Sequence, residues 1–316
     1  MASRSAKHRT RIFAWLLTLA LVLASCATEG EPGEDGIVVV ATTSILGDIA
    51  STVIGDQGHV EVLIPIDADS HEFQPSSQQA SRIAGADLVV ANGLGLEPGL
   101  QDILGSAMAD GLLVIELAPL VDPIPFSEPG DHDEEAGLEH GNQDPHFWMD
   151  PIRVGDAALA LAAELTELYP DGAWEERASE YVGEMATTDQ AIRGLFDQIP
   201  DSARQMVTNH EAFGYFAARY GFEVIGVVIP GGSTLAEPSS AELAALVEIM
   251  ESEGVRVIFA ETSQPTALAE AVAAEVGGDV DVVELFTESL GPPGSGAETL
   301  SKMLLTNAER ISAALG

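Results

Sequence analysis

The feature that most constrains the fold is an alternation, along residues 37–316, between short β-branched segments and longer segments with helical patterning. Such alternation is typical of parallel sheets, because each parallel connection must cross over the sheet, usually through a helix. We expect four strands in the first half, near 37–41, 60–65, 87–91 and 113–117. Four more are expected in the second half, near 205–208, 223–228, 255–260 and 281–286. The sequence therefore predicts an α/β fold of two similar lobes, each a mostly parallel four-stranded sheet with flanking helices.

A long stretch without proline separates the two halves. Residues 172–198 are rich in Glu, Ala and Gln and predict one helix of about 25 residues, roughly 38 Å long at about 1.5 Å per residue. We expect this rigid helix to join an N-terminal lobe, 37–171, to a C-terminal lobe, 199–316. Two shorter helices, broken near Thr187 or Gly194, are the alternative.

Three helix starts carry clear signals. Ser76 with Gln79, and Ser239 with Glu242, fit the capping box, in which each side chain bonds the other residue's backbone N–H. Asp150 followed by Pro151 fits a capping residue and a proline at the first helical position.

The N-terminal sequence indicates a targeting segment. Four basic residues within positions 4–11 precede the apolar run 12–24, the pattern of a secretory signal, and the run is too short for a comfortable membrane span. Small residues precede Cys26, the only cysteine, and resemble a bacterial lipobox. We expect a signal peptide over 1–25, lipid on Cys26 and a flexible tether over 26–36. An ordinary secreted protein with an incidental cysteine is the alternative.

The charge balance excludes one class of partner. With 51 acidic and 13 basic residues, the formal net charge is −38, whereas nucleic-acid binding needs clustered Lys and Arg. Such a surface is also repelled by anionic lipid headgroups, so attachment to the membrane would come from acyl chains. The single cysteine also excludes a zinc site built on several thiolates of one chain.

Residues 119–145 are unlike the rest. They contain five prolines, and the part from 127 to 144 has seven acidic residues, His132, His140 and no base. A long loop inside a domain is usually functional or disordered. A solvated acidic loop and a weak metal-collecting loop are equally good interpretations, since His-bearing tracts bind metals.

Three other histidines have a common setting. His71, His146 and His210 each lie in a loop just before a predicted helix, and such loops at the carboxyl ends of strands bind ligands in open α/β sheets. A lone loop histidine is more often structural, but three in similar settings favour a shared site between the lobes. Zinc sites of this type are completed by a carboxylate or water. Glu261 and Glu288 both follow a strand, and spacing cannot choose between them.

These segments resemble the metal-binding lipoproteins of zinc and manganese ABC importers. The resemblance covers most of 37–315 and is carried by residues 39–49, 65–75, 86–97, 144–151, 210–222, 261 and 286–291. It implies two α/β lobes joined by one rigid helix, with a single metal ion between them. It also implies that His71, His146 and His210 are the first three ligands and that Glu288 is the fourth.

The sequence departs from the family's pattern at three places. Ser70 replaces a frequent proline, Glu97 is followed by Pro and Gly where the family has Glu-x-Trp, and Glu288 stands where aspartate is usual. Metal-bound histidine normally donates its other ring N–H to an oxygen acceptor, and we expect Asn92 and Glu211 to be such acceptors.

The donor types indicate the metal. Three imidazoles and one carboxylate suit zinc, whereas oxygen-rich sets suit manganese. By resemblance, the third position is histidine in zinc proteins and glutamate in many manganese proteins, so His210 favours Zn²⁺, with Mn²⁺ as the alternative. The expected function is that of a monomeric solute-binding lipoprotein on the extracytoplasmic face of the cell membrane. It would capture the ion and deliver it to a permease and its ATPase.

Two other classes remain open. A secreted zinc hydrolase would need a general base, and Glu211 is the candidate, but the sequence has no H-E-x-x-H, G-x-S-x-G or G-x-x-x-x-G-K-[ST] motif. A lipid-anchored adhesin is the third class. We expect no enzymatic activity.

Overall fold

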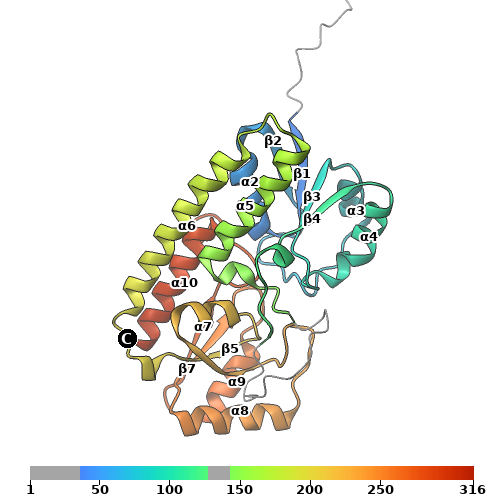
Figure 1. Ribbon diagram of the computed structural model, residues 1–316. Helices are drawn as coiled ribbons and strands as arrows, with labels where there is room; N and C mark the ends of the chain where they lie inside the picture. Colours follow the sequence, from blue (N-terminus) through green and yellow to red (C-terminus); the bar gives the residue numbers. More distant parts are fainter. Residues whose placement is uncertain (1–35, 127–142) are drawn as a thin grey trace, which may run out of the picture. The chain divides into compact units, whose positions relative to one another are not determined.

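The computed structural model describes residues 36–126 and 143–316 (Figure 1). The expected signal peptide, Cys26 and all but the last residue of the tether lie outside the described residues. So does 127–142, the part of the acidic loop that contains His132 and His140. No helix in the described ranges combines the length and the apolar character that crossing a membrane requires.

The first sheet is built from β1 (Ile37–Ala41), β2 (Gly58–Val62), β3 (Leu88–Ala91) and β4 (Leu113–Glu116). Its strands are all parallel and have the order β2-β1-β3-β4. The helices of this half are α2 (Ser44–Ile54), α3 (Ser77–Ala84), α4 (Gln101–Ala109) and α5 (Pro151–Leu168).

The second sheet repeats this topology. Strands β5 (Gln205–Thr208), β6 (Glu223–Val227), β7 (Val257–Glu261) and β8 (Asp281–Leu285) are parallel and have the order β6-β5-β7-β8. Its helices are α7 (Gly214–Tyr220), α8 (Ser240–Glu253), α9 (Ala267–Val276) and α10 (Leu300–Leu315). The equal strand order of the two sheets confirms the predicted fold of two similar α/β lobes.

Strand β2 differs most from its prediction. It begins at Gly58 and ends at Val62, whereas 60–65 was expected, so the exposed His59 lies within the strand. The parallel register explains the shift, because Ile37 pairs with Gly58 and Ala41 with Val62. The apolar residues that follow, Leu63 and Ile64, still donate backbone hydrogen bonds to the end of β1 and to Thr42.

Helix α6 (Trp174–Phe196) occupies the segment for which a connecting helix was expected. It is continuous through Thr187 and Gly194, and its 23 residues span about 34 Å. It packs against α2, α5 and α10, as Figure 1 shows. Arg177 on α6 donates to the carbonyl oxygens of Val53 and Ile54 at the end of α2, which fastens α6 to the first lobe.

One hydrophobic core runs through both lobes. It contains Val39 and Val90 of the first sheet and Phe259 and Leu285 of the second, together with apolar side chains of α2, α5, α6 and α10. Because side chains alternate along a strand, the other face of each sheet forms a separate cluster. Ile83 of α3 and Leu104 of α4 belong to the first, and Leu246 of α8 and Val272 of α9 to the second. The shared core means that the lobes are packed together and not merely tethered.

The predicted helix starts are confirmed. Ser76 and Ser239 each form a complete capping box, and Asp150 accepts a 2.9 Å hydrogen bond from the N–H of Ile152 at the start of α5. These caps satisfy backbone donors that a helix leaves without a partner. They also determine where the loops carrying His71 and His146 must end.

Candidate metal centre

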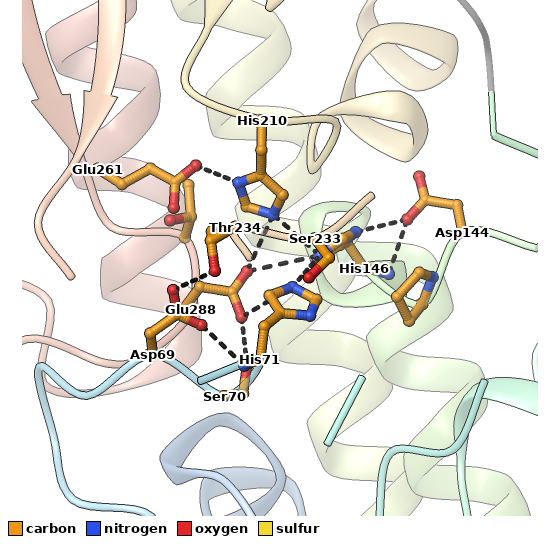
Figure 2. Close-up of polar contacts among 12 residues, drawn as sticks. Asp69, Ser70, His71, Asp144, His146, His210, Ser233, Thr234, Glu261 and Glu288 are labelled. Carbon is orange, nitrogen blue, oxygen red and sulfur yellow. Dashed lines mark hydrogen bonds and ion pairs between the residues drawn. The ribbon is translucent and has the colours of Figure 1, made fainter. Parts of the chain in front are cut away.

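Four of the predicted site residues lie together, as Figure 2 shows. His71 follows β2, His146 lies shortly before α5, His210 follows β5, and Glu288 follows β8. Each offers one ligand atom, and these four atoms lie within 4.8 Å of one another. All four side chains are buried, with at most 2% of each residue exposed. The two lobes therefore bring together groups that are up to 217 positions apart in the sequence.

The distances between these atoms suit a single small ion. The Nε2 atom of His146 lies 3.3 Å from Nε2 of His71 and 3.3 Å from Nε2 of His210. Oε1 of Glu288 lies 3.5 Å from Nε2 of His146 and 3.6 Å from Nε2 of His210. A tetrahedral ion with Zn–N bonds of about 2.0–2.1 Å keeps its ligand atoms about 3.3–3.4 Å apart. These four separations are close to that value, and all the ligand atoms lie within 4.8 Å of one another.

His71 and His146 each follow a turn of the same kind. Oδ1 of Asp69 accepts a 2.7 Å hydrogen bond from the N–H of His71, and Oδ1 of Asp144 accepts a 2.9 Å bond from the N–H of His146. An aspartate whose side-chain oxygen accepts the backbone N–H two residues further on forms an Asx turn. Sequence reasoning assigned these aspartates no role, although the repeated Asp-x-His spacing is a signal that could have identified them.

Carboxylates orient two of the rings. Asp144 Oδ1 lies 2.7 Å from Nδ1 of His146, and Oε1 of Glu261 contacts Nδ1 of His210. A partner on Nδ1 leaves Nε2 as the nitrogen that points to the centre. Glu261 was one of two candidates for the fourth ligand position. The structure places it behind His210, outside the four-atom group, and places Glu288 inside that group.

The expectation that Asn92 and Glu211 accept hydrogen bonds from the rings is wrong for His146 and His210. Their Nδ1 atoms face Asp144 and Glu261 instead. The amide of Asn92 donates to the carbonyl oxygens of Gly93 and Pro145, both at 3.1 Å, so it supports the backbone beside His146. Oε1 of Glu211 accepts a 3.3 Å bond from the N–H of Gly231. The ring acceptors come from the His146 turn itself and from β7, which pairs with β5 beside His210.

The His71 loop of the first lobe is fastened to the second lobe. Oδ2 of Asp69 accepts hydrogen bonds from the hydroxyl of Thr234, at 2.6 Å, and from the side-chain amide of Gln264. The hydroxyl of Ser70 donates to Oε2 of Glu288 (Figure 2). The position of His71 therefore depends on contacts across the lobe boundary.

The protonation states of the three rings differ. Burial lowers the pKa of His71 to about 4 and that of His146 to about 3. Burial also acts to lower the pKa of His210, but the facing carboxylate of Glu261 outweighs it and raises the value to about 9. Burial raises the pKa of Glu288. At neutral pH two rings therefore have free lone pairs, and His210 must lose a proton before it can bind a cation.

A cavity leads from the surface to His71. Its volume is about 960 Å³, and both lobes line it, with Glu116, Phe126 and Pro145 on one side and Gly231 and Ser233 on the other. The described residues that line it include no lysine or arginine. The approach therefore presents no positive side chain to an incoming cation.

Comparisons with known proteins agree with this geometry. The family described as zinc-uptake complex component A, periplasmic, matches residues 39–314. The manganese-binding lipoprotein MntA of Halalkalibacterium halodurans is 28% identical over 306 residues, which cover 95% of this chain and 96% of that protein. The zinc-binding protein TroA of Treponema pallidum is 28% identical over 326 residues, covering 97% and 99%. The solved structure of that TroA is similar, with a TM-score of 0.78 at 26% identity, covering 89% of this chain and 99% of the other.

Proposed function

Because this chain belongs to the family of periplasmic zinc-uptake components, we propose that it captures Zn²⁺ between its lobes and delivers it to an ABC importer. The protein is an extracytoplasmic metal-binding component of such an importer, and two relatives that match nearly the whole chain are named as ABC transporter substrate-binding lipoproteins. The identity of the ion is the proposed part. It rests on one observation, the buried group of three imidazole nitrogens and one carboxylate oxygen, in which the other three atoms lie 3.3–3.5 Å from Nε2 of His146. Nitrogen-rich sets of this kind suit zinc.

The geometry favours capture over catalysis. A catalytic zinc keeps one position open for water beside a general base. Here four protein atoms, three imidazole nitrogens and one carboxylate oxygen, gather around one centre. Glu211, the candidate base of a hydrolase, accepts a hydrogen bond from Gly231. The family is one of transport proteins, which agrees with a role without chemistry.

Delivery would take place at the cell membrane. We propose that the signal peptide 1–25 is removed, that lipid on Cys26 anchors a monomer outside the membrane, and that residues 26–36 act as a tether. A permease and its ATPase are the partners that this arrangement implies. The lobes 37–171 and 199–316, joined through 172–198, share one core, so release would involve the ligand loops and small lobe movements and not a wide hinge.

Manganese is the second candidate, because one relative that matches nearly the whole chain is named as manganese-binding. Manganese prefers sites richer in oxygen, so a manganese role would need selectivity from geometry. The metal content of the purified protein, followed by competition between Zn²⁺ and Mn²⁺, separates the two. We expect one bound zinc per chain and displacement of Mn²⁺ by Zn²⁺ at equal concentrations.

The variant His210→Ala tests the site itself. Because it removes a donor nitrogen, its loss of zinc affinity should exceed the roughly 10–100-fold that losing a supporting group costs. His59→Ala is the matched control, since His59 is an exposed histidine on β2. Zinc accumulation in a strain that lacks the protein should be restored by the wild type and by the control only. Preferential binding of manganese by the wild type would refute the zinc proposal.

A further inference from the structure

The two oxygens of the Glu288 carboxylate have different surroundings. Oε2 accepts a hydrogen bond from the hydroxyl of Ser70, which is fully buried and belongs to the other lobe. Oε1 is buried, accepts no hydrogen bond from the described residues, and faces the Nε2 atoms of His146 and His210. Ser70 and Glu288 are also two of the positions at which the sequence departs from the family's pattern, and they contact each other.

We propose that Ser70 is a positioning residue that makes Glu288 bind the ion through Oε1 alone, and that it thereby selects a four-coordinate ion. This inference rests on the proposed function, because it assumes that the four-residue group binds a metal. A carboxylate can bind a cation through one oxygen or through both. The hydroxyl of Ser70 takes one of the two lone-pair sites of Oε2 and holds that oxygen in place, which leaves Oε1 as the better donor.

Freeing Oε2 would add a ligand. This atom lies 3.8 Å from Nε2 of His71, so it borders the same small volume as the other donors. Without the hydroxyl of Ser70, both oxygens of Glu288 are near enough to take part. Zinc is usually coordinated by four ligands, whereas manganese favours more oxygen atoms and a higher coordination number. The hydrogen bond from Ser70 to Glu288 therefore favours zinc over manganese.

The backbone on either side of Ser70 is held by several hydrogen bonds. Its neighbour Asp69 binds the backbone of His71 with one oxygen, and Thr234 and Gln264 of the second lobe with the other. The short segment 69–71 thus sends two side chains to the second lobe and one ring to the centre, as Figure 2 shows. These contacts hold the backbone of residue 70, so the hydroxyl can leave Glu288 only if the Ser70 side chain changes its rotamer or the contacts of Asp69 change.

The test uses Co²⁺ as a spectroscopic probe of coordination number in the wild type and in Ser70→Ala, together with the Zn²⁺ to Mn²⁺ affinity ratio. Four-coordinate Co²⁺ absorbs visible light strongly, and five- or six-coordinate Co²⁺ absorbs it weakly. We expect strong absorption in the wild type and a clear loss in Ser70→Ala. The affinity ratio should shift about tenfold toward manganese, the effect that one hydrogen bond to a charged group has on an equilibrium.

Two further variants keep the result interpretable. Ser289→Ala is the matched control, because the hydroxyl of Ser289 accepts from the N–H of Asp67 across the same lobe boundary. It should keep the wild-type spectrum and ratio. Ser70→Thr retains a hydroxyl and should keep the wild-type Co²⁺ spectrum and the wild-type Zn²⁺ to Mn²⁺ affinity ratio. Their unfolding midpoints show whether each variant is folded.

The outcomes separate this inference from the proposed function. A wild type with strong Co²⁺ absorption and zinc preference, but with an unchanged Ser70→Ala, overturns the role of Ser70 and leaves the zinc site standing. Weak absorption and no zinc preference in the wild type overturn both. Loss of absorption in Ser289→Ala to the same degree as in Ser70→Ala also overturns the inference, because any contact at the lobe boundary would then have the same effect.

Discussion

The hydroxyl of Thr234 donates a 2.6 Å hydrogen bond to Oδ2 of Asp69, and this contact joins the second lobe to the turn that presents His71. The other oxygen of the same carboxylate accepts the backbone N–H of His71. One side chain therefore shapes the ligand loop and fastens it across the lobe boundary. The position of His71 and the packing of the lobes are linked through Asp69.

Removing the Thr234 hydroxyl should weaken both the packing of the lobes and the binding of zinc by His71. We expect Thr234→Val to lower the free energy of unfolding by about 1–3 kcal/mol, because Asp69 loses a buried donor. Zinc affinity should fall several-fold, since the His71 turn is held less firmly. Urea denaturation and chelator competition measure the two effects. Thr187→Val is the control, because that exposed hydroxyl bonds only a carbonyl oxygen within α6. Equal stability losses in both variants would contradict the prediction.

Gly214 should be needed because of its contact with Asp144. A Cβ atom added at Gly214 would lie 2.6 Å from Oδ2 of Asp144, the residue that orients His146. We expect Gly214→Ala to displace that carboxylate and to lower zinc affinity by roughly 10–100-fold, as loss of a supporting group does. Gly183→Ala is the matched control. A Cβ there meets nothing among the described residues within 4 Å, and alanine in a helix interior stabilises it by about 0.5–1 kcal/mol. Unchanged zinc affinity in Gly214→Ala would show that Asp144 does not orient His146.

Zinc binding should release about one proton per ion near pH 8, where the carboxyl of Asp144, with a pKa of about 7, is already ionised, and at least one at lower pH. His71 and His146 are already neutral there, with pKa values near 4 and 3, whereas the pKa of His210 is about 9 because of Glu261. Ligand nitrogens must be unprotonated, so affinity should rise about tenfold per pH unit near pH 8. Calorimetry in two buffers of different ionisation enthalpy counts the protons. In Glu261→Gln the count above pH 7 should fall toward zero, because the charge that holds the proton is gone. Zinc affinity that is equal at about pH 5 and pH 7.5 would contradict this assignment.

The three histidines of the site should contribute most to the stability of the metal-free protein slightly below neutral pH, whereas the buried carboxyls of Asp144 and Glu97, with pKa values of about 7, act in the opposite direction as pH falls. The pKa of His210 is raised on folding, so its contribution is complete below about pH 6.5 and is lost as pH rises through about 9. The pKa values of His71 and His146 are lowered, so stability is lost as pH falls below about 6.5, where the unfolded chain takes up protons. The high-pH loss should be on the order of 3 kcal/mol. Urea midpoints at about pH 6.5 and 9.5 measure the loss at high pH, and His210→Ala should lack this decline.

The sequence was informative wherever a signal is local or periodic. Alternating segments predicted both sheets, and capping residues such as Ser76 and Ser239 marked helix starts that the structure confirms. The settings of His71, His146 and His210, together with the family resemblance, predicted which side chains would meet. These predictions succeeded because strand periodicity, helix capping and the position of ligand loops depend on neighbouring residues.

Other features were decided only by tertiary structure. Sequence spacing left Glu261 and Glu288 as equal candidates and only the family resemblance favoured Glu288, whereas the pairing of β7 with β5 placed Glu261 behind His210. The partners of Asp69 and Ser70 are 165 and 218 positions away, in the other lobe. A hydrogen bond forms only between atoms about 3 Å apart, and that distance results from how two separately wound sheets pack on one core. The sequence alone determined the elements and the donor types, and the packing of the lobes determined which donor faces the centre and which residue holds it there.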